Sequence, residues 1–278
     1  MKRNIIISTI VGTVAILGAS LSFAEPIHAI PTTAPLMKEL TPATTSANSF
    51  STTQQADIQK IVHDYLISNP EVLMQASQVL QRKMLEQQKT KTMSAIRQMD
   101  LSDLLNNPNS PVAGNKNGAT TLIEYFDYQC PHCRNLAATL DTTMKANPDL
   151  RVVFKEFPIY GAISELGSRA ALAANRQGKY YAYHRALYNA KTQINEQLVL
   201  QIANQLKLNM AQFKKDLNDN AIAQEIKHNQ KTATQLGFMG TPAIVIMPTK
   251  GDAQSPIQFF PGDTSQANLQ KMIDAVKS

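Results

Sequence analysis

The sequence Phe126-Asp127-Tyr128-Gln129-Cys130-Pro131-His132-Cys133 contains both cysteines of a chain of 278 residues. Before it, residues 120–128 are rich in β-branched and aromatic side chains and predict a strand. After it, residues 131–145 predict a helix and residues 150–157 a second strand. The order strand, helix, strand is that of a βαβ unit, so the cysteines lie at its strand-to-helix turn.

Cys130 comes at the start of the predicted helix, where free backbone N–H groups and the helix dipole favour a thiolate. Pro131 suits the first helical turn because it has no N–H, and His132 adds a positive charge or a donor. Cys133 follows one turn deeper. We therefore expect Cys130 to be an exposed nucleophile for thiol–disulfide exchange and Cys133 to be the resolving thiol.

Other roles for these residues carry less weight. A Cys-x-x-Cys pair is half of a zinc site, but a structural zinc needs four ligands, and the chain has no further cysteine and no paired histidines. A disulfide between Cys130 and Cys133 closes so short a loop that it removes little chain entropy, so stability is a poor reason for it. For His132, a plain position on the helix surface is the alternative.

The second half of the chain predicts a run of helices and then two strands. The helices span residues 163–236, with Asn195, Asn209 and Asn220 as caps. The strands at 243–247 and 256–260 precede a closing helix at 265–276. Thr241-Pro242 opens the first of these strands after a glycine-rich turn and is a candidate cis peptide, although local sequence alone favours trans.

The N-terminus predicts an export signal over residues 1–24. Lys2 and Arg3 precede an uncharged apolar run, and small residues allow cleavage after Ala24 or Ala29. An uncleaved anchor is the alternative, and no later stretch of the sequence is apolar enough to cross a bilayer. Residues 25–51 predict a flexible linker because they are rich in Pro, Thr, Ser and Ala.

A helical extension is predicted over residues 52–100. Apolar side chains recur at helical spacing on both sides of Asn69-Pro70-Glu71, where Asn69 suits a cap and Pro70 a first helical position. Such short helices must bury their apolar face. Packing against a second copy of the chain and packing against the main domain both remain open at this point.

Charge excludes one class of partner. The whole chain has a net charge of +6, and removal of Lys2 and Arg3 with the signal leaves 25 basic and 21 acidic side chains. The sequence has no dense basic cluster with interleaved aromatic residues. We therefore expect no nucleic-acid binding.

The Cys-Pro-His-Cys motif in its βαβ context, with Gly-Thr-Pro before a later strand, resembles the DsbA-like branch of the thioredoxin superfamily. The resemblance covers residues 105–278. It implies an α/β thioredoxin-like fold with a helical domain inserted at about 162–236, here preceded by the α-helical N-terminal extension. It also implies that Thr241-Pro242 is cis, which reverses the local expectation.

The resemblance implies two further site residues. Glu124 stands six residues before Cys130, where family members often carry a buried acid, and Lys155 lies on the next strand, where a lysine often accompanies it. Such a pair under the thiols would pass protons to or from Cys133. A buried charge is costly unless it is paired, so this interpretation requires both side chains to point inward.

The implied function is that of a periplasmic oxidoreductase that forms or isomerises disulfides, without a cofactor because the cysteines carry the electrons. Its expected partners are cysteine-containing exported proteins, a membrane redox partner and a second copy of the chain. The extension and Thr241 resemble isomerases, whereas Pro131-His132 resembles oxidases, so the balance between the two stays open. The alternative is a dimeric periplasmic chaperone or surface-associated binding protein on the same fold.

Overall fold

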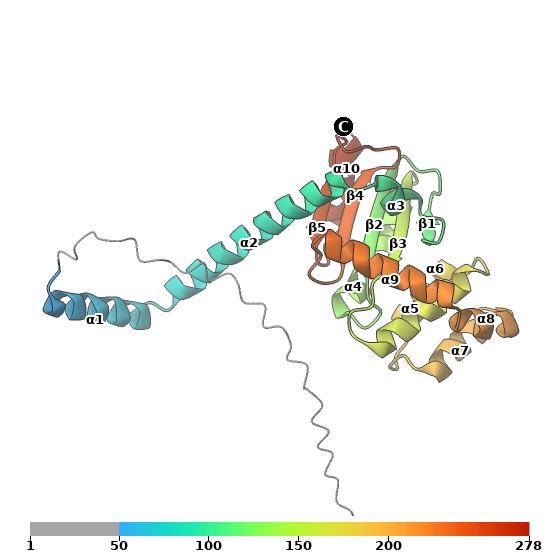
Figure 1. Ribbon diagram of the computed structural model, residues 1–278, viewed down its shortest axis with the longest axis horizontal. Helices are drawn as coiled ribbons and strands as arrows, with labels where there is room; N and C mark the ends of the chain where they lie inside the picture. The colour runs from blue at the N-terminus through green and yellow to red at the C-terminus, as the bar shows by residue number, and fades with distance from the viewer. Residues whose placement is uncertain (1–49, 278) are drawn as a thin grey trace, which may run out of the picture. The chain divides into compact units, whose positions relative to one another are not determined.

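Figure 1 shows the computed structural model of the protein, which describes residues 50–277. Its contacts divide the described chain after Ser68 into two compact units. The described part of the first unit contains helix α1 (Thr52–Ser68). The predicted export signal and all but the last two residues of the predicted linker lie outside the described residues.

The second unit is a five-stranded sheet with helices on both faces. Its helices are α2 (Glu71–Gln98), α3 (Leu101–Asn106), α4 (Pro131–Ala146), α5 (Ala162–Asn175), α6 (Tyr180–Asn189), α7 (Glu196–Gln205), α8 (Met210–Leu217), α9 (Asn220–Gln235) and α10 (Gln266–Lys277). Its strands are β1 (Val112–Gly114), β2 (Thr120–Phe126), β3 (Leu150–Glu156), β4 (Ala243–Pro248) and β5 (Gln258–Pro261). The thioredoxin-like α/β fold expected from the sequence is therefore present, with α5–α9 between β3 and β4.

The sheet has the strand order β1-β3-β2-β4-β5. Strands β2 and β3 are parallel and are joined by α4, which makes the predicted βαβ unit. The other neighbouring pairs are antiparallel. In the β2–β3 register, Glu124 lies opposite Phe154 and Tyr125 lies opposite Lys155.

Both faces of the sheet are buried, so β2 and β3 have no exposed residue and read as continuous apolar runs with a few charges. One face carries Leu122 and Phe126 and packs on α4, α10 and the inserted helices α5–α8. The other carries Ile123 and Tyr125 and packs on α2, α3 and the end of α9. Because side chains alternate along a strand, neighbouring residues of β2 belong to different cores.

Local capping explains most helix starts. Asn195 and Asn209 accept hydrogen bonds from the backbone N–H groups of Leu198 and Gln212, as predicted. The prediction for Asn220 is wrong by one residue, because Asp219 is the cap and its carboxylate accepts from Ala221 N at 2.8 Å.

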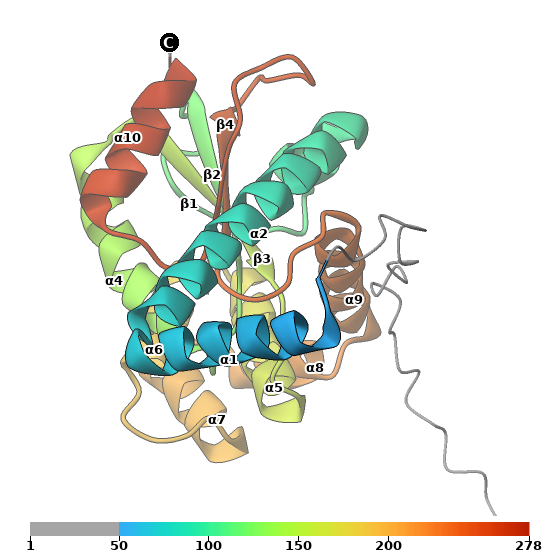
Figure 2. The same cartoon turned by 90° about the vertical axis from the view of Figure 1, so that its left-hand side faces the viewer.

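Two differences concern the N-terminal helices. Helix α2 begins at Glu71 with Pro70, not Asn69, at the cap position. The sequence also does not predict α3, a single short turn that starts after Asp100, whose carboxylate accepts from Ser102 N. The division between the two units falls after Ser68, inside the predicted extension, because the last turns of α2 pack on the main domain (Figure 2).

The N-terminal helices expose much apolar surface. Helix α1 has no buried residue, and α2 buries only Thr92 and Ile96. The exposed apolar side chains on the two helices are Ile58, Ile61, Val62, Tyr65, Ile67, Leu73, Met74, Val79, Leu80 and Met84. Within residues 50–277, none of the helices has the length and apolar character needed to cross a membrane.

Candidate active site

The two cysteines occupy the turn from β2 into α4. Cys130 is the cap residue of α4 with extended backbone, and its carbonyl accepts the hydrogen bond of Arg134 N. Pro131 is the first helical residue, where its missing N–H costs nothing. Cys133 lies inside the first turn and is fully buried. Both side chains are free thiols in this structure.

The loop before β4 meets the first thiol. The Thr241–Pro242 peptide bond is cis, as the resemblance implies. In its protonated form, the Cys130 thiol donates to the carbonyl oxygen of Thr241 at 3.2 Å. Residues more than a hundred positions apart in the sequence thus meet here, since β4 lies beside β2 in the sheet.

The pKa values of the two thiols shift in opposite directions. A hydrogen bond with the Cys133 side chain is the main cause that lowers the pKa of Cys130 to about 5, and burial opposes it. The Thr241 side chain and the His132 backbone lower the Cys130 pKa further. For Cys133, burial is the main cause that raises the pKa well above its usual value. Cys130 is therefore a thiolate at neutral pH, whereas Cys133 holds its proton.

Cys130 is not exposed, contrary to the expectation from the sequence. Its relative accessibility is 1%. Partial burial and the nearby Cys130 raise the pKa of Tyr160, whose ring is itself half exposed. Tyr160 belongs to the loop after β3, so this loop lies beside the thiol. Attack by a protein thiol therefore requires side chains around Cys130 to move aside.

Glu124 is fully buried on the face of the sheet that carries α4 and the thiols. Neither of its carboxyl oxygens has a hydrogen-bond partner among the described residues. Burial is the main cause that raises the pKa of Glu124 to about 8, and the neighbouring Glu156 adds to it. Glu124 is also one of the charges that raise the pKa of Cys133. A protonated carboxylic acid therefore lies within electrostatic reach of the resolving thiol at neutral pH.

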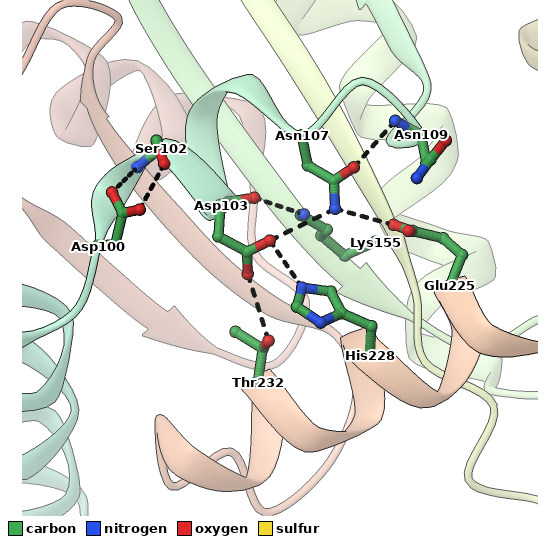
Figure 3. Close-up of polar contacts among 9 residues, drawn as sticks. All are labelled: Asp100, Ser102, Asp103, Asn107, Asn109, Lys155, Glu225, His228 and Thr232. Atoms are coloured by element: carbon green, nitrogen blue, oxygen red, sulfur yellow. Dashed lines mark hydrogen bonds and ion pairs between the residues drawn. The ribbon is translucent and has the colours of Figure 1, made fainter.

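The expected pairing of Lys155 with Glu124 is wrong. Lys155 is fully buried, but it points to the opposite face of the sheet, as its neighbour Tyr125 does. Its ammonium donates to the backbone oxygen of Asp103 in α3 at 2.8 Å (Figure 3). Alternation along the strand is the reason: Glu124 lies opposite Phe154, so the next residue of β3 must face away from it.

Figure 3 shows what surrounds Lys155 instead. The Asp103 carboxylate is 2.6 Å from His228 Nε2 and accepts from Thr232 Oγ1 at 3.3 Å. Asn107 Nδ2 donates to Glu225 at 3.2 Å. These contacts join α3 to α9, so Lys155 belongs to a structural cluster rather than to the thiol site.

The residue that accompanies Glu124 is Glu156, which the sequence analysis missed. It is fully buried on the same face, and burial raises its pKa to about 8. Its Oε1 accepts from the hydroxyl groups of Tyr180 at 2.8 Å and Tyr128 at 3.3 Å. Alternation along β3 places it there once the strand register is known, because a residue two positions from Phe154 must share the face of Glu124.

Asp127, also missed, organises the turn itself. Its buried carboxylate accepts four hydrogen bonds, from Gln129 N, Ile159 N, Tyr160 N and Ser164 Oγ, at 2.6–3.1 Å. These bonds hold the loop after β3 against the residues that precede Cys130. The sequence signal for this role is an acidic residue at the end of a predicted strand, three positions before Cys130.

His132 lies on the surface of α4 with a side-chain exposure of 63%. Its Nδ1 is 3.0 Å from Oδ1 of Asp263, a residue in the loop after β5 that the sequence did not single out. Among residues 50–277, there is no group of three His, Cys, Asp or Glu side chains arranged to hold a metal ion.

The family matches agree with this geometry. Residues 121–274 match the DSBA-like thioredoxin domain, and residues 54–87 match the copper resistance protein ScsC N-terminal domain. The first match spans more than half of the chain and includes the cysteine motif, the inserted helices and the cis-proline loop.

Three known proteins illustrate the similarity. A thioredoxin-like oxidoreductase of Silicibacter pomeroyi DSS-3 is 37% identical, with a TM-score of 0.59 over 64% of this chain and 98% of that one. BcfH of Salmonella enterica Typhimurium is 30% identical, with a TM-score of 0.63 over 81% of this chain and 97% of that one. A probable disulfide bond formation protein D of Bacillus anthracis is 25% identical over 146 residues, which cover 48% of this chain and 67% of that protein.

The sheet order, the helices inserted between β3 and β4, the thiols at the start of α4 and the cis-proline loop beside them all belong to one fold. With the matched domain and the structural relatives, they show that the chain is a member of the DSBA-like thioredoxin domain family of thiol–disulfide oxidoreductases.

Proposed function

We propose that this protein exchanges disulfides with cysteines of exported proteins, with Cys130 as the nucleophile and Cys133 as the resolving thiol. The observation that carries the proposal is the contrast between the two thiols, one with a lowered pKa and the other with a raised pKa, beside the main-chain carbonyl of Thr241, which lies 3.2 Å from Cys130 Sγ. Exchange needs a good leaving thiolate next to a protonated thiol, and this turn provides both.

In the oxidising direction, a client thiolate attacks Sγ of Cys130 in the Cys130–Cys133 disulfide. The bond to Cys133 breaks, and Cys133 leaves with the electron pair and takes a proton. A second client thiolate then attacks the client sulfur, and Cys130 leaves as a thiolate. The client has lost two electrons and gained a disulfide, and the protein has become a dithiol. A membrane redox partner would reoxidise it by the reverse exchange.

Glu124 supplies the proton in this scheme. Because its pKa is about 8, it is mostly protonated at neutral pH, and it is within electrostatic reach of Cys133. It donates to the leaving Cys133 thiolate and recovers the proton when the disulfide forms again. Glu156 favours this role, because a second carboxyl nearby discourages ionisation of Glu124.

Client peptides are proposed to bind beside Thr241. The backbone carbonyl of Thr241 points to the thiol and can accept a hydrogen bond from an extended chain. Three apolar side chains on the loops next to the site are exposed, Ile159, Tyr160 and Met239. Such a surface suits unfolded segments, and it serves both disulfide formation and isomerisation.

The N-terminal helices are proposed to join copies of the chain, a dimer being the simplest assembly. The support is the set of exposed apolar side chains on α1 and the first half of α2, in the region that matches the ScsC N-terminal domain. Light scattering on the mature protein tests this. The paired change Ile61→Ser and Leu80→Ser is expected to lower the mass to that of one chain, and an unchanged oligomer would contradict it.

The same apolar surface favours a second candidate function, that of a chaperone whose thiols matter little. A single experiment separates the two. Wild type, Cys130→Ala and Cys133→Ala are assayed for oxidation and isomerisation of a reduced or scrambled client. The oxidoreductase proposal requires no exchange by Cys130→Ala and trapped mixed disulfides with Cys133→Ala. Client protection that persists in Cys130→Ala, without exchange by the wild type, would favour the chaperone.

The proposed location is the periplasm, and its support is the export signal predicted over residues 1–24. Expression of the full chain followed by mass determination of the exported product tests it. A product that begins after Ala24 or Ala29 agrees with the proposal, and an uncleaved chain in the cell contents contradicts it.

A further inference from the structure

A pocket lies between α2 and the loop that precedes the cis-proline. One wall comes from α2, and the loop contributes Gly237 and Met239. The pocket has a volume of about 220 Å³. Sites that enclose a whole small molecule are larger, roughly 300–1,000 Å³. The pocket therefore suits one side chain of a larger partner.

The α2 wall is one face of the helix, and it is fastened to the loop. Met84, Gln88 and Lys91 follow one another at four- and three-residue steps, so they lie on the same side of α2. The buried hydroxyl of Thr92 donates to the carbonyl oxygen of Leu236, directly before the loop, at 2.9 Å. Helix α2 also contacts β5 of the sheet. These contacts hold both walls of the pocket in place.

The lining combines apolar side chains with one charge. Met239 is 83% exposed and Met84 is 57% exposed, and flexible thioether side chains adapt to apolar partners of different shape. Lys91 is the only charged side chain among the described residues that line the pocket. It is exposed and forms no ion pair within residues 50–277, whereas its neighbour Lys89 is 3.3 Å from Glu86. The lining thus complements an apolar side chain with an acid close by.

The pocket is continuous with the thiol site. Met239 is two residues before Thr241, whose carbonyl oxygen lies 3.2 Å from Cys130 Sγ. Two residues of extended chain span at most about 7 Å. Side chains alternate along an extended client, so the residue two positions from its cysteine points to the same side as that cysteine. Such a residue reaches the pocket while the client cysteine is joined to Cys130.

We infer that this pocket selects clients by sequence: it takes a large apolar side chain two positions from the client cysteine, with an acidic residue further along the client beside Lys91. The inference rests on the proposed exchange function and adds a sequence preference to it. The second half of α2 then takes part in client recognition, beyond any role of the N-terminal helices in assembly.

The test uses Cys133→Ala with Cys130 joined to glutathione. The thiolate of a single-cysteine peptide attacks the Cys130 sulfur, the peptide–Cys130 disulfide forms, and glutathione leaves as a thiolate. The equilibrium constant of this displacement compares peptides directly, because the same kinds of bond form and break in each case. The peptides carry Leu or Ser two positions from the cysteine and Glu or Lys four positions from it. One series has these residues before the cysteine, and a second series has them after it.

In one of the two series, Leu is expected to raise the displacement constant about three- to tenfold over Ser, and Met239→Ser is expected to remove this preference. Glu is expected to be favoured over Lys about two- to fivefold, and Lys91→Glu is expected to reverse this order. Lys83→Glu is the matched control, since Lys83 is an exposed lysine of α2 outside the pocket. It is expected to keep both preferences.

A Leu preference that persists in Met239→Ser would overturn the inference, and so would a Glu preference that persists in Lys91→Glu, because another surface would then recognise the peptide. Light scattering on the same variants tests a second occupant. Their mass is expected to equal that of Cys133→Ala alone. A lower mass would overturn the inference too, because another copy of the chain would then cover the pocket.

The displacement experiment also separates this inference from the proposed function. If no peptide displaces glutathione from Cys130, the proposed exchange function fails. If displacement occurs with equal constants for every peptide, only the role of the pocket fails.

Discussion

The two faces of the central sheet treat buried charge differently. On one face, burial lowers the pKa of Lys155, but the acids Asp103 and Glu225 oppose that shift, and the ammonium donates to the Asp103 carbonyl at 2.8 Å. On the other face, Glu124 and Glu156 have no cation among their described neighbours, and both have a raised pKa. A buried charge with an oppositely charged neighbour can stabilise the fold. Buried acids without such a neighbour stay protonated near neutral pH and can act as proton donors.

Burial alone does not identify a functional charge. All three side chains are fully buried, on neighbouring strands. The presence or absence of an oppositely charged neighbour is what distinguishes Lys155 from the two glutamates.

The largest effect is expected from Glu124→Gln. The variant keeps the shape of the side chain but cannot supply a proton to Cys133, so we expect exchange to slow about ten- to a hundredfold at pH 7. Stopped-flow oxidation of a reduced peptide by the disulfide form measures it. An unchanged rate, with the same fold by circular dichroism, would remove Glu124 from the mechanism.

The second prediction concerns pH and the reduced protein. The folded Cys130 thiolate takes a proton only near pH 5, while an unfolded cysteine does so near 8.5, so the unfolded state binds more protons between these values. Stability from the thiolate is therefore fully present above about pH 8.5 and is lost as the pH falls through 5.

At pH 7 this contribution is about 2 to 3 kcal/mol. Urea unfolding of reduced wild type and reduced Cys130→Ala, from pH 4.5 to 8, measures the difference between them. The wild type should lose its advantage over Cys130→Ala on acidification. Parallel pH profiles for the two proteins would mean that Cys130 is not a stabilised thiolate.

The third prediction tests the opposite face. Lys155→Met leaves the Asp103 carbonyl without its donor, so we expect a loss of about 1 to 3 kcal/mol in unfolding free energy. Exchange rates should stay within about twofold of wild type, because Lys155 faces away from the thiols. A twofold change in rate corresponds to a change of less than ~0.5 kcal/mol in the activation free energy. A large decrease in the exchange rate without a decrease in unfolding free energy would contradict this prediction and assign Lys155 a role in exchange.

The smallest effect is expected from Glu156→Gln. An amide oxygen can still accept from Tyr180, but the second carboxyl is gone, so Glu124 should ionise at lower pH. The pH dependence of the exchange rate should shift downward by about one unit. Tyr180→Phe is the control, because it removes the hydrogen bond and keeps both acids. A profile that moves equally in both variants would point to hydrogen bonding instead.

Much of the fold was predictable from short stretches of sequence. The strand before Cys130, the helix that Pro131 begins and the caps Asn195 and Asn209 all depend on neighbours within a few residues. The single turn α3 was not, because six residues show no periodicity. The pairing of Glu124 with Lys155 failed for another reason, since resemblance placed both residues on adjacent strands without regard to the face of the sheet.

The chemistry of the turn follows from the local sequence: a thiolate at a helix start, a second thiol one turn on and a proline that begins the helix. These depend on backbone geometry, which is local. The side chains that surround those groups depend on tertiary contacts instead. Glu156 reaches the side of Glu124 through strand pairing, and Asp263 reaches His132 across 131 positions of the chain. Such contacts arise when the sheet closes, and no local pattern encodes which distant side chains it brings together.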